Sequence, residues 1–70
     1  MIMELMKEIV DGKLIVTGKG GENKNMPWVT LVFNVAKNDL IDLEYYFNED
    51  EAKQGHENTI EYFRKEQNNE

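Results

Sequence analysis

Two strand-like segments in residues 28–47, WVTLVFNVAKNDLIDLEYYF, constrain the fold more than any other feature of the sequence. Both are rich in Val, Leu, Phe and Tyr, and a short polar segment separates them, which predicts an antiparallel pair of strands. A three-residue loop, Lys37-Asn38-Asp39, would place Ala36 opposite Leu40. The resulting register pairs Val35 with Ile41, Phe33 with Leu43, Leu31 with Tyr45, and Val29 with Phe47.

This register predicts a ribbon with two unlike faces, because alternate residues of a strand point to opposite sides. The face formed by the pairs above is apolar along its whole length, and we predict that it is the core face. The opposite face is mixed, and we predict that it is solvated or bound to a partner. It carries Trp28, Thr30, Val32, Asn34, Asp42, Glu44 and Tyr46.

The first twenty residues contain a second hairpin signal. Asp11-Gly12 stands between apolar residues, a pattern typical of a two-residue hairpin loop. It predicts strands near residues 4–10 and 13–18, with Ile9 facing Leu14 and Lys7 facing Val16. A short N-terminal helix is the competing interpretation for residues 2–10, because their apolar residues also fall at helical spacing and Gly12 could follow the helix end.

A helix is predicted after residue 47. Asn48 is placed as its N-cap, Glu51 completes a capping box, and Phe47 could pack against Ala52. Gly55 interrupts the pattern and predicts either a kink or close packing against the sheet. The tail, residues 66–70, is predicted to fray. The buried stripe of the helix is predicted to comprise Ala52, His56, Thr59, Ile60 and Phe63.

These elements predict one small α+β domain spanning residues 1–70. We expect an antiparallel meander of three or four strands, with a single C-terminal helix packed on its apolar face. A chain of 70 residues buries only about 60% of the surface that it exposes when unfolded, so its core is small. A homodimer is therefore an open alternative, as is a structural subunit whose apolar N-terminus completes a neighbour's sheet.

The segment TGKGGENKNMPW, residues 17–28, resembles a phosphate-binding loop only in its glycine content. Such loops need glycines at fixed spacing before a helix, whereas here Pro27 precedes a strand. We predict a connection between strands, with Asn23, Lys24 and Asn25 as turn formers. A binding loop that uses Lys19, Lys24 and Trp28 is the alternative.

The sequence indicates neither an enzyme nor a metal or cofactor site. It contains no cysteine, which excludes disulfides and Cys-based zinc sites. His56 begins HENTI, where Ile60 replaces the second histidine of a zinc-protease motif, and NEDE at residues 48–51 lacks calcium-loop spacing. His56 is predicted to be a packed residue at the boundary of helix and sheet, with its polar edge in solvent. We predict no catalytic residues, no metal and no cofactor.

Charge is distributed unevenly along the chain, whose formal net charge is -6. Residues 1–38 hold five lysines and four acidic residues, whereas residues 39–70 hold three cations and ten acidic residues. Such a field disfavours direct binding to nucleic acid or anionic lipid and favours basic partners. The first ten residues lack the pattern of a signal peptide and no segment has the length of a membrane span, so we expect a cytoplasmic protein.

From these features we predict a small acidic, non-catalytic interaction protein. It would bind a basic protein surface, such as that of a nucleic-acid-processing protein, and act as an inhibitor that mimics nucleic acid. A phage or other mobile element is the origin that size and charge suggest. Tyr62 is a further candidate aromatic anchor. The predicted partner-binding residues are Asp42, Glu44, Tyr46, Asp50, Glu57, Glu61 and Trp28.

The alternative prediction is a module that binds single-stranded nucleic acid. A sheet followed by a helix can present aromatic residues to bases and lysines to the backbone. The residues that would serve this function are Lys13, Lys19, Lys24, Lys37 and Trp28. The absence of a basic stripe argues against it.

Overall fold

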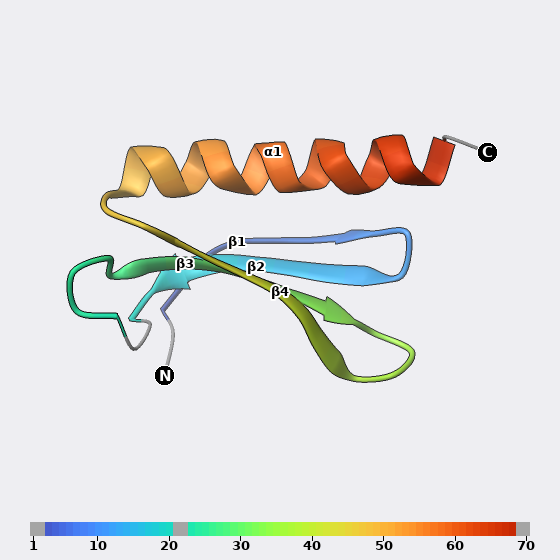
Figure 1. The fold of residues 1–70 in the computed structure, drawn as a ribbon, viewed down its shortest axis with the longest axis horizontal. Coiled ribbons are helices and arrows are strands. Elements are labelled where there is room, and N and C mark those ends of the chain that lie inside the picture. Colours follow the sequence, from blue (N-terminus) through green and yellow to red (C-terminus); the bar gives the residue numbers. More distant parts are fainter. Residues whose placement is uncertain (1–2, 21–22, 69–70) are drawn as a thin grey trace.

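The computed structural model describes residues 3–20 and 23–68. One antiparallel sheet with the strand order β1-β2-β3-β4 packs against a single helix (Figure 1). The predicted α+β class, with a β-meander and a C-terminal helix packed against it, is confirmed. The elements are β1 (Met3–Val10), β2 (Lys13–Lys19), β3 (Trp28–Asn34), β4 (Asp39–Tyr46) and α1 (Glu49–Asn68).

The first hairpin forms as the Asp-Gly signal predicts. Asp11 and Gly12 both have positive φ angles, 49° and 73°, which is the conformation of the type I′ turn that suits the twist of two strands. Ile9 pairs with Leu14 and Lys7 with Val16, as predicted. Residues 3–10 are therefore a strand and not a helix, whereas residue 2 lies outside the described residues.

The second hairpin has a longer loop than predicted and a register shift between Val32 and Phe33, so the predicted register was wrong by three residues next to the loop and by two residues beyond the shift. Asn34 pairs with Asp39 and Leu31 with Leu43, which leaves residues 35–38 as the loop. Asn34 stabilises this loop because its side-chain oxygen accepts the Lys37 amide at 3.2 Å and its carbonyl accepts the Asn38 amide at 2.7 Å. Asn38 has a φ of 58°, a conformation that asparagine tolerates well.

The connection between β2 and β3 is held by backbone bonds at its base. The Gly20 amide donates to the Pro27 carbonyl at 2.9 Å. Asn23 forms the predicted turn, because its side-chain oxygen accepts the amides of Asn25 at 3.0 Å and Met26 at 3.2 Å. Residues 21–22 of this loop lie outside the described residues, and its role as a binding loop stays a prediction.

The start of α1 follows the predicted capping pattern. Asn48 Oδ1 accepts the Glu51 amide at 2.9 Å, and Glu51 Oε1 accepts the Phe47 amide at 3.2 Å. The Phe47 side chain itself remains 61% exposed. The helix runs through Gly55 without a break and continues to Asn68, and residues 69–70 of the predicted frayed tail lie outside the described residues.

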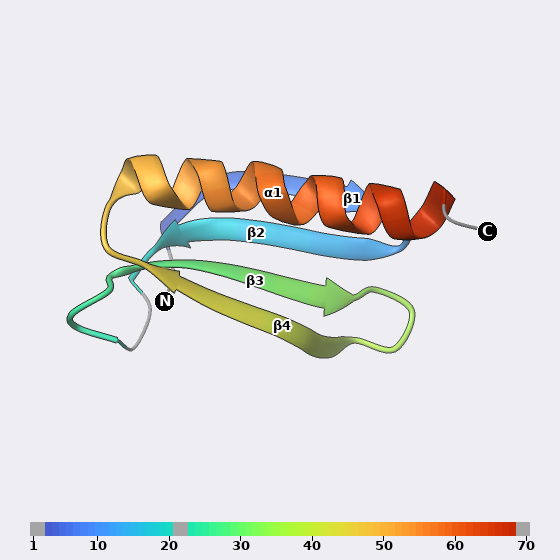
Figure 2. The ribbon, with the colours of Figure 1, turned by 45° about the horizontal axis from the view of Figure 1, so that its top comes forward.

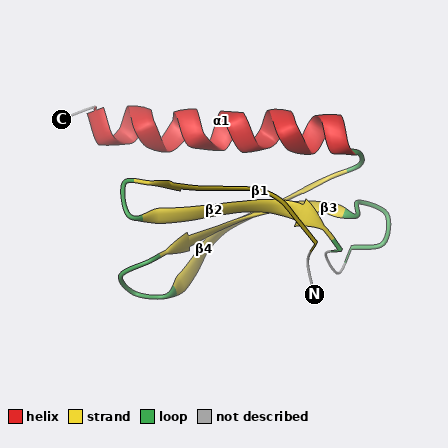
Figure 3. Ribbon diagram, turned by 180° about the vertical axis from the view of Figure 1, so that it is seen from behind, coloured by secondary structure: helices red, strands yellow, loops and turns green. Residues whose placement is uncertain are grey.

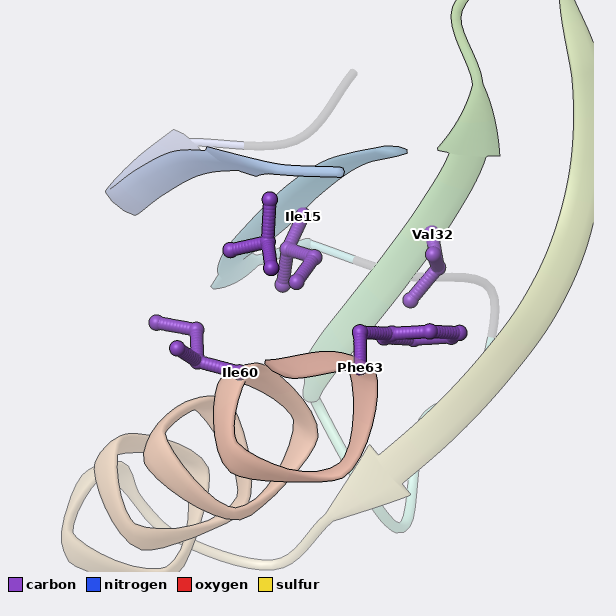
Figure 4. Packing of buried hydrophobic residues seen from close by; sticks show 5 residues of the cluster. Ile15, Val32, Ile60 and Phe63 are labelled. Carbon is purple, nitrogen blue, oxygen red and sulfur yellow. The ribbon is translucent and has the colours of Figure 1, made fainter. Parts of the chain in front are cut away.

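The helix covers the mixed face of the sheet, so the predicted assignment of the core face was wrong. Ile60 and Phe63 pack with residues of three strands in a buried cluster (Figure 4). The helix lies on one side of the sheet only (Figure 3), so the apolar face, whose side chains alternate with those of the cluster, lies on the side away from α1. Only Phe47 and Asn48 separate β4 from α1, which keeps the helix beside the last strand residue, Tyr46. The five residues of the cluster are Val10, Ile15, Val32, Ile60 and Phe63.

Polar complementarity also favours this arrangement. His56 belongs to the buried stripe of α1 and forms a hydrogen bond with Thr17, whose hydroxyl also contacts that of Thr30; the mixed face supplies both threonines. The apolar face offers aliphatic and aromatic side chains at the corresponding positions, and a buried imidazole facing them would lose hydrogen bonds at a cost of about 1–3 kcal/mol. Hydrophobic content alone therefore did not decide which face the helix covers.

Candidate interaction site

A groove opens between α1 and the edge strand β4, with a volume of about 310 Å³. The sheet twists so that β4 diverges from the helix, which packs mainly on β1, β2 and β3 (Figure 2). We call this feature the acidic groove because two carboxylates form one of its walls. Its lining residues are Asp42 and Glu44 from β4, and Asn58, Thr59, Tyr62 and Phe63 from α1.

Strand pairing explains why both carboxylates point into the groove. Thr30 pairs with Glu44 and Val32 with Asp42, so all four side chains lie on the helix side of the sheet. Thr30 and Val32 are buried under α1, whereas Asp42 and Glu44 are exposed because β4 lies at the diverging edge. In the part of the chain that the structure describes, the ion pairs involve neither Asp42 nor Glu44.

The helix contributes an aromatic and polar wall to the acidic groove. Tyr62 is 62% exposed and contacts the Phe63 ring edge to face, with ring centroids 5.1 Å apart and an angle of 82°. Asn58 and Thr59 lie one turn earlier on the same side. Carboxylates beside an aromatic ring suit the ammonium or guanidinium group of a basic ligand, which can form charge-assisted hydrogen bonds and a cation–π contact.

Tyr46 lies beside the groove and connects its acidic wall to the protein interior. Its hydroxyl donates to Glu44 Oε1 at 3.1 Å. Burial raises the pKa of Tyr46, and the hydrogen bond to Glu44 and the charges of Glu44 and Asp42 act in the same direction, whereas a hydrogen bond from Thr30 opposes them. The phenol therefore stays protonated and holds Glu44 in place.

The other predicted partner-binding residues do not line the acidic groove. Asp50, Glu57 and Glu61 are exposed on α1, and the helical spacing of 100° per residue turns them away from Asn58 and Tyr62. Trp28 is half-buried in the same cross-strand row as Tyr46, with Lys19 Nζ 5.9 Å from the centre of its ring. The predicted acidic surface is thus divided between two sides of the helix.

The lysines of the alternative prediction are distributed between the two ends of the sheet. Lys13 begins β2 and is paired with Asp11 at 4.0 Å, with its Nζ 5.3 Å from the centre of the Phe63 ring. Lys37 lies in the loop near the same end, because the Val35 amide donates to the Gly12 carbonyl at 3.0 Å. Lys19 ends β2, and Lys24 lies in the loop beyond it. No continuous lysine track follows from these positions.

A buried polar chain joins the helix to the two central strands. Thr17 Oγ1 lies 2.6 Å from Thr30 Oγ1 and 2.7 Å from His56 Nδ1. His56 is 1% exposed, so it is packed as predicted, but its ring is enclosed and not at the solvent edge. Burial lowers the pKa of His56, although the charges of Glu57 and Glu8 oppose this effect, and the imidazole is neutral at pH 7.

Sequence reasoning identified Asp42, Glu44 and Tyr62 but missed Asn58, Thr59 and Phe63 as groove residues. Asn58 and Tyr62 are four residues apart, a spacing that places them on one side of a helix. This spacing could have predicted that Asn58 and Tyr62 lie beside Asp42 and Glu44 only if it had been known which face of the sheet the helix covers. Within residues 3–20 and 23–68, no three His, Asp or Glu side chains come together as metal ligands.

Comparison with known proteins gives no family assignment. No family model, no curated protein and no solved structure matches the chain. Among the described residues, no helix has the length and apolar character needed to cross a membrane. The site's own geometry must therefore support any functional proposal.

Proposed function

We propose that this is a small, non-catalytic interaction protein that binds a basic segment of a partner protein in the acidic groove. The groove itself is the observation that supports the proposal most directly. Its two carboxylates, Asp42 and Glu44, are exposed and line the groove together with Tyr62. A lysine or arginine side chain would find opposite charge and a ring surface within the same volume of about 310 Å³.

The charge of the whole chain supports the same class of partner. A net charge of -6 attracts a basic surface from a distance and increases the rate of encounter. Asp50, Glu57 and Glu61 would contribute to this long-range attraction from the outer side of α1, without contacting the ligand in the groove. A partner that normally binds nucleic acid has such a basic surface, and the protein would inhibit it by occupying that surface.

The proposal is tested with a short peptide of lysine and arginine residues, titrated into isotopically labelled protein at low salt. We expect the largest chemical-shift changes at the amides of Asp42, Glu44, Asn58 and Tyr62. The double variant Asp42→Asn/Glu44→Gln should bind about tenfold more weakly, which corresponds to about 1.4 kcal/mol.

The matched control removes the same number of charges from the other side of the helix. Asp50→Asn/Glu57→Gln should reduce the affinity much less, because it changes only the long-range field. Equal losses in the two double variants would show that the peptide responds to net charge alone, and the groove would then not be the binding site. Competition between the protein and nucleic acid for an identified basic partner would test the inhibitory part of the proposal.

A further inference from the structure

The face of the sheet opposite α1 is apolar, and the part of it formed by the middle of the sheet and the two hairpin ends has no covering element among the described residues. Val29, near the other end of this face, is the buried exception at 1% exposed. Cross-strand pairing aligns Ile9, Leu14 and Phe33 in one row, and Val16, Leu31 and Leu43 in the next. We call these six residues and their immediate neighbours the open face. Ile9 is 67% exposed and Leu43 is 43% exposed. Figures 1 and 3 show the helix on the other side of the sheet only.

We propose that a second copy of this chain covers the open face, so that two sheets pack against each other with both helices outside. Sheet-on-sheet packing places two such faces about 10 Å apart, with their strands crossing at about 30°. A contiguous apolar face of this kind is rare on a monomer and typically marks an interaction site. The resulting order of layers would be helix, sheet, sheet, helix.

Charge distribution favours a second copy as the occupant. The chain as a whole carries a net charge of -6, but the open face is nearly neutral. Lys7 and Glu4 both lie on it and pair with each other, with 3.8 Å between Lys7 Nζ and Glu4 Oε1. Asp42 and Glu44 point to the helix side, so two acidic chains can join through this face while their carboxylates remain in solvent.

The size of the open face suits a small homodimer interface. Four strands about 4.8 Å apart and seven residues long give a projected area of roughly 450 Å². Two such faces together would bury roughly 900 Å² in projection, which is in the range of small, weak interfaces and below the roughly 1,600 Å² of a standard one. The chain exposes 5036 Å², whereas a monomer of 8.2 kDa typically exposes about 4,500 Å². Dimerisation through this face would remove that excess.

The structure also indicates which surfaces a dimer leaves free. The acidic groove is lined by residues on the helix side of the sheet, and α1 itself lies on the side away from the open face (Figure 1). The dimer would therefore present two acidic grooves, one from each copy. This inference rests on the open face alone and does not depend on what binds in the groove.

Sedimentation equilibrium of the wild-type chain tests the proposal. We expect twice the chain mass of 8.2 kDa, with a dissociation constant in roughly the micromolar range or below. Ile9→Lys and Leu43→Lys should shift the mass to that of one chain while the circular dichroism spectrum is retained. Gln54→Lys, which adds the same charge at an exposed residue of α1 outside the groove, should leave the dimer intact.

A second measurement does not depend on the variants folding. In a mixture of labelled and unlabelled wild-type chains, isotope-filtered NOE spectra should show contacts between copies at the methyl groups of Ile9, Leu31 and Leu43. If the measured mass stays that of one chain at protein concentrations up to about 1 mM, the proposal is overturned. The open face would then be a site for an apolar partner of another kind. A dimer that survives both lysine variants or shows its contacts elsewhere would overturn it as well.

Discussion

Gly55 on α1 contacts the phenol ring of Tyr46 on β4 so closely that a methyl group at position 55 would overlap the ring. The glycine is buried within an unbroken helix and therefore serves close packing, which was one of the two explanations that the sequence left open. Tyr46 in turn holds Glu44 through its hydroxyl, with a donor–acceptor distance of 3.1 Å. The missing side chain thus helps to fix the acidic groove.

We predict that Gly55→Ala destabilises the protein although alanine favours helix formation. The gain in helix propensity is at most about 1 kcal/mol, whereas overpacking typically costs about 1–3 kcal/mol. The free energy of unfolding, measured with urea, should fall by about 1–2 kcal/mol. In a Tyr46→Ala background the same substitution should instead stabilise by up to about 1 kcal/mol, because the overlap is gone. An equal effect in both backgrounds would contradict the role assigned to Tyr46.

Local turn and cap chemistry made much of the fold predictable. Asp11-Gly12 specified both the turn and the register of β1 and β2, and Asn48 with Glu51 specified the start of α1. The register of β3 and β4 was less accessible, because it depends on the Asn34 side chain accepting the Lys37 amide. A three-residue and a four-residue loop look nearly alike in sequence.

The covered face of the sheet could not be read from hydrophobicity. The more apolar face was expected to receive the helix, but the short connection after Tyr46 and the hydrogen bond between His56 and Thr17 favour the other face. Consequently Asp42 and Glu44 could be assigned to a common face, while their grouping with Asn58 and Tyr62 could not. The open face was missed for the same reason.

Thr17 is predicted to contribute more to stability than its size suggests. Its hydroxyl is the only group shared by the two short contacts of the buried chain, to Thr30 Oγ1 at 2.6 Å and to His56 Nδ1 at 2.7 Å. Thr17→Val keeps the shape but leaves two buried polar groups without this partner, so urea denaturation should show a loss of about 1–3 kcal/mol. Thr17→Ser should retain most of the stability. If Thr17→Val left the free energy of unfolding unchanged, the hydrogen bonds among Thr17, Thr30 and His56 would contribute little to stability.

Stability should decrease as the pH falls below the ordinary pKa of histidine. Burial lowers the pKa of His56 from 6.5, against the charges of Glu57 and Glu8, so the unfolded chain takes up a proton before the folded chain does. The contribution of neutral His56 to the free energy of unfolding is complete above pH 6.5. It is lost as the pH falls towards the folded-state pKa, by at most about 1.4 kcal/mol per pH unit. Urea midpoints between about pH 7.5 and pH 5.5 measure this decrease. His56→Gln should show a smaller slope, and identical slopes would assign the pH dependence to other groups.

Gly12 provides a contrast to Gly55, because a side chain at position 12 is disfavoured by the backbone conformation and not by lack of space. Its φ is +73°, and a Cβ at this position would meet no heavy atom within 4 Å. Gly12→Ala should therefore destabilise the hairpin by about 1–2 kcal/mol through backbone strain alone. Gly12→Asn should cost less, since asparagine tolerates the left-handed region. Urea denaturation of the two variants provides the comparison. An alanine variant as stable as the wild type would mean that the turn relaxes to another type, and the Ile9–Leu14 pairing should then be lost from the amide exchange pattern.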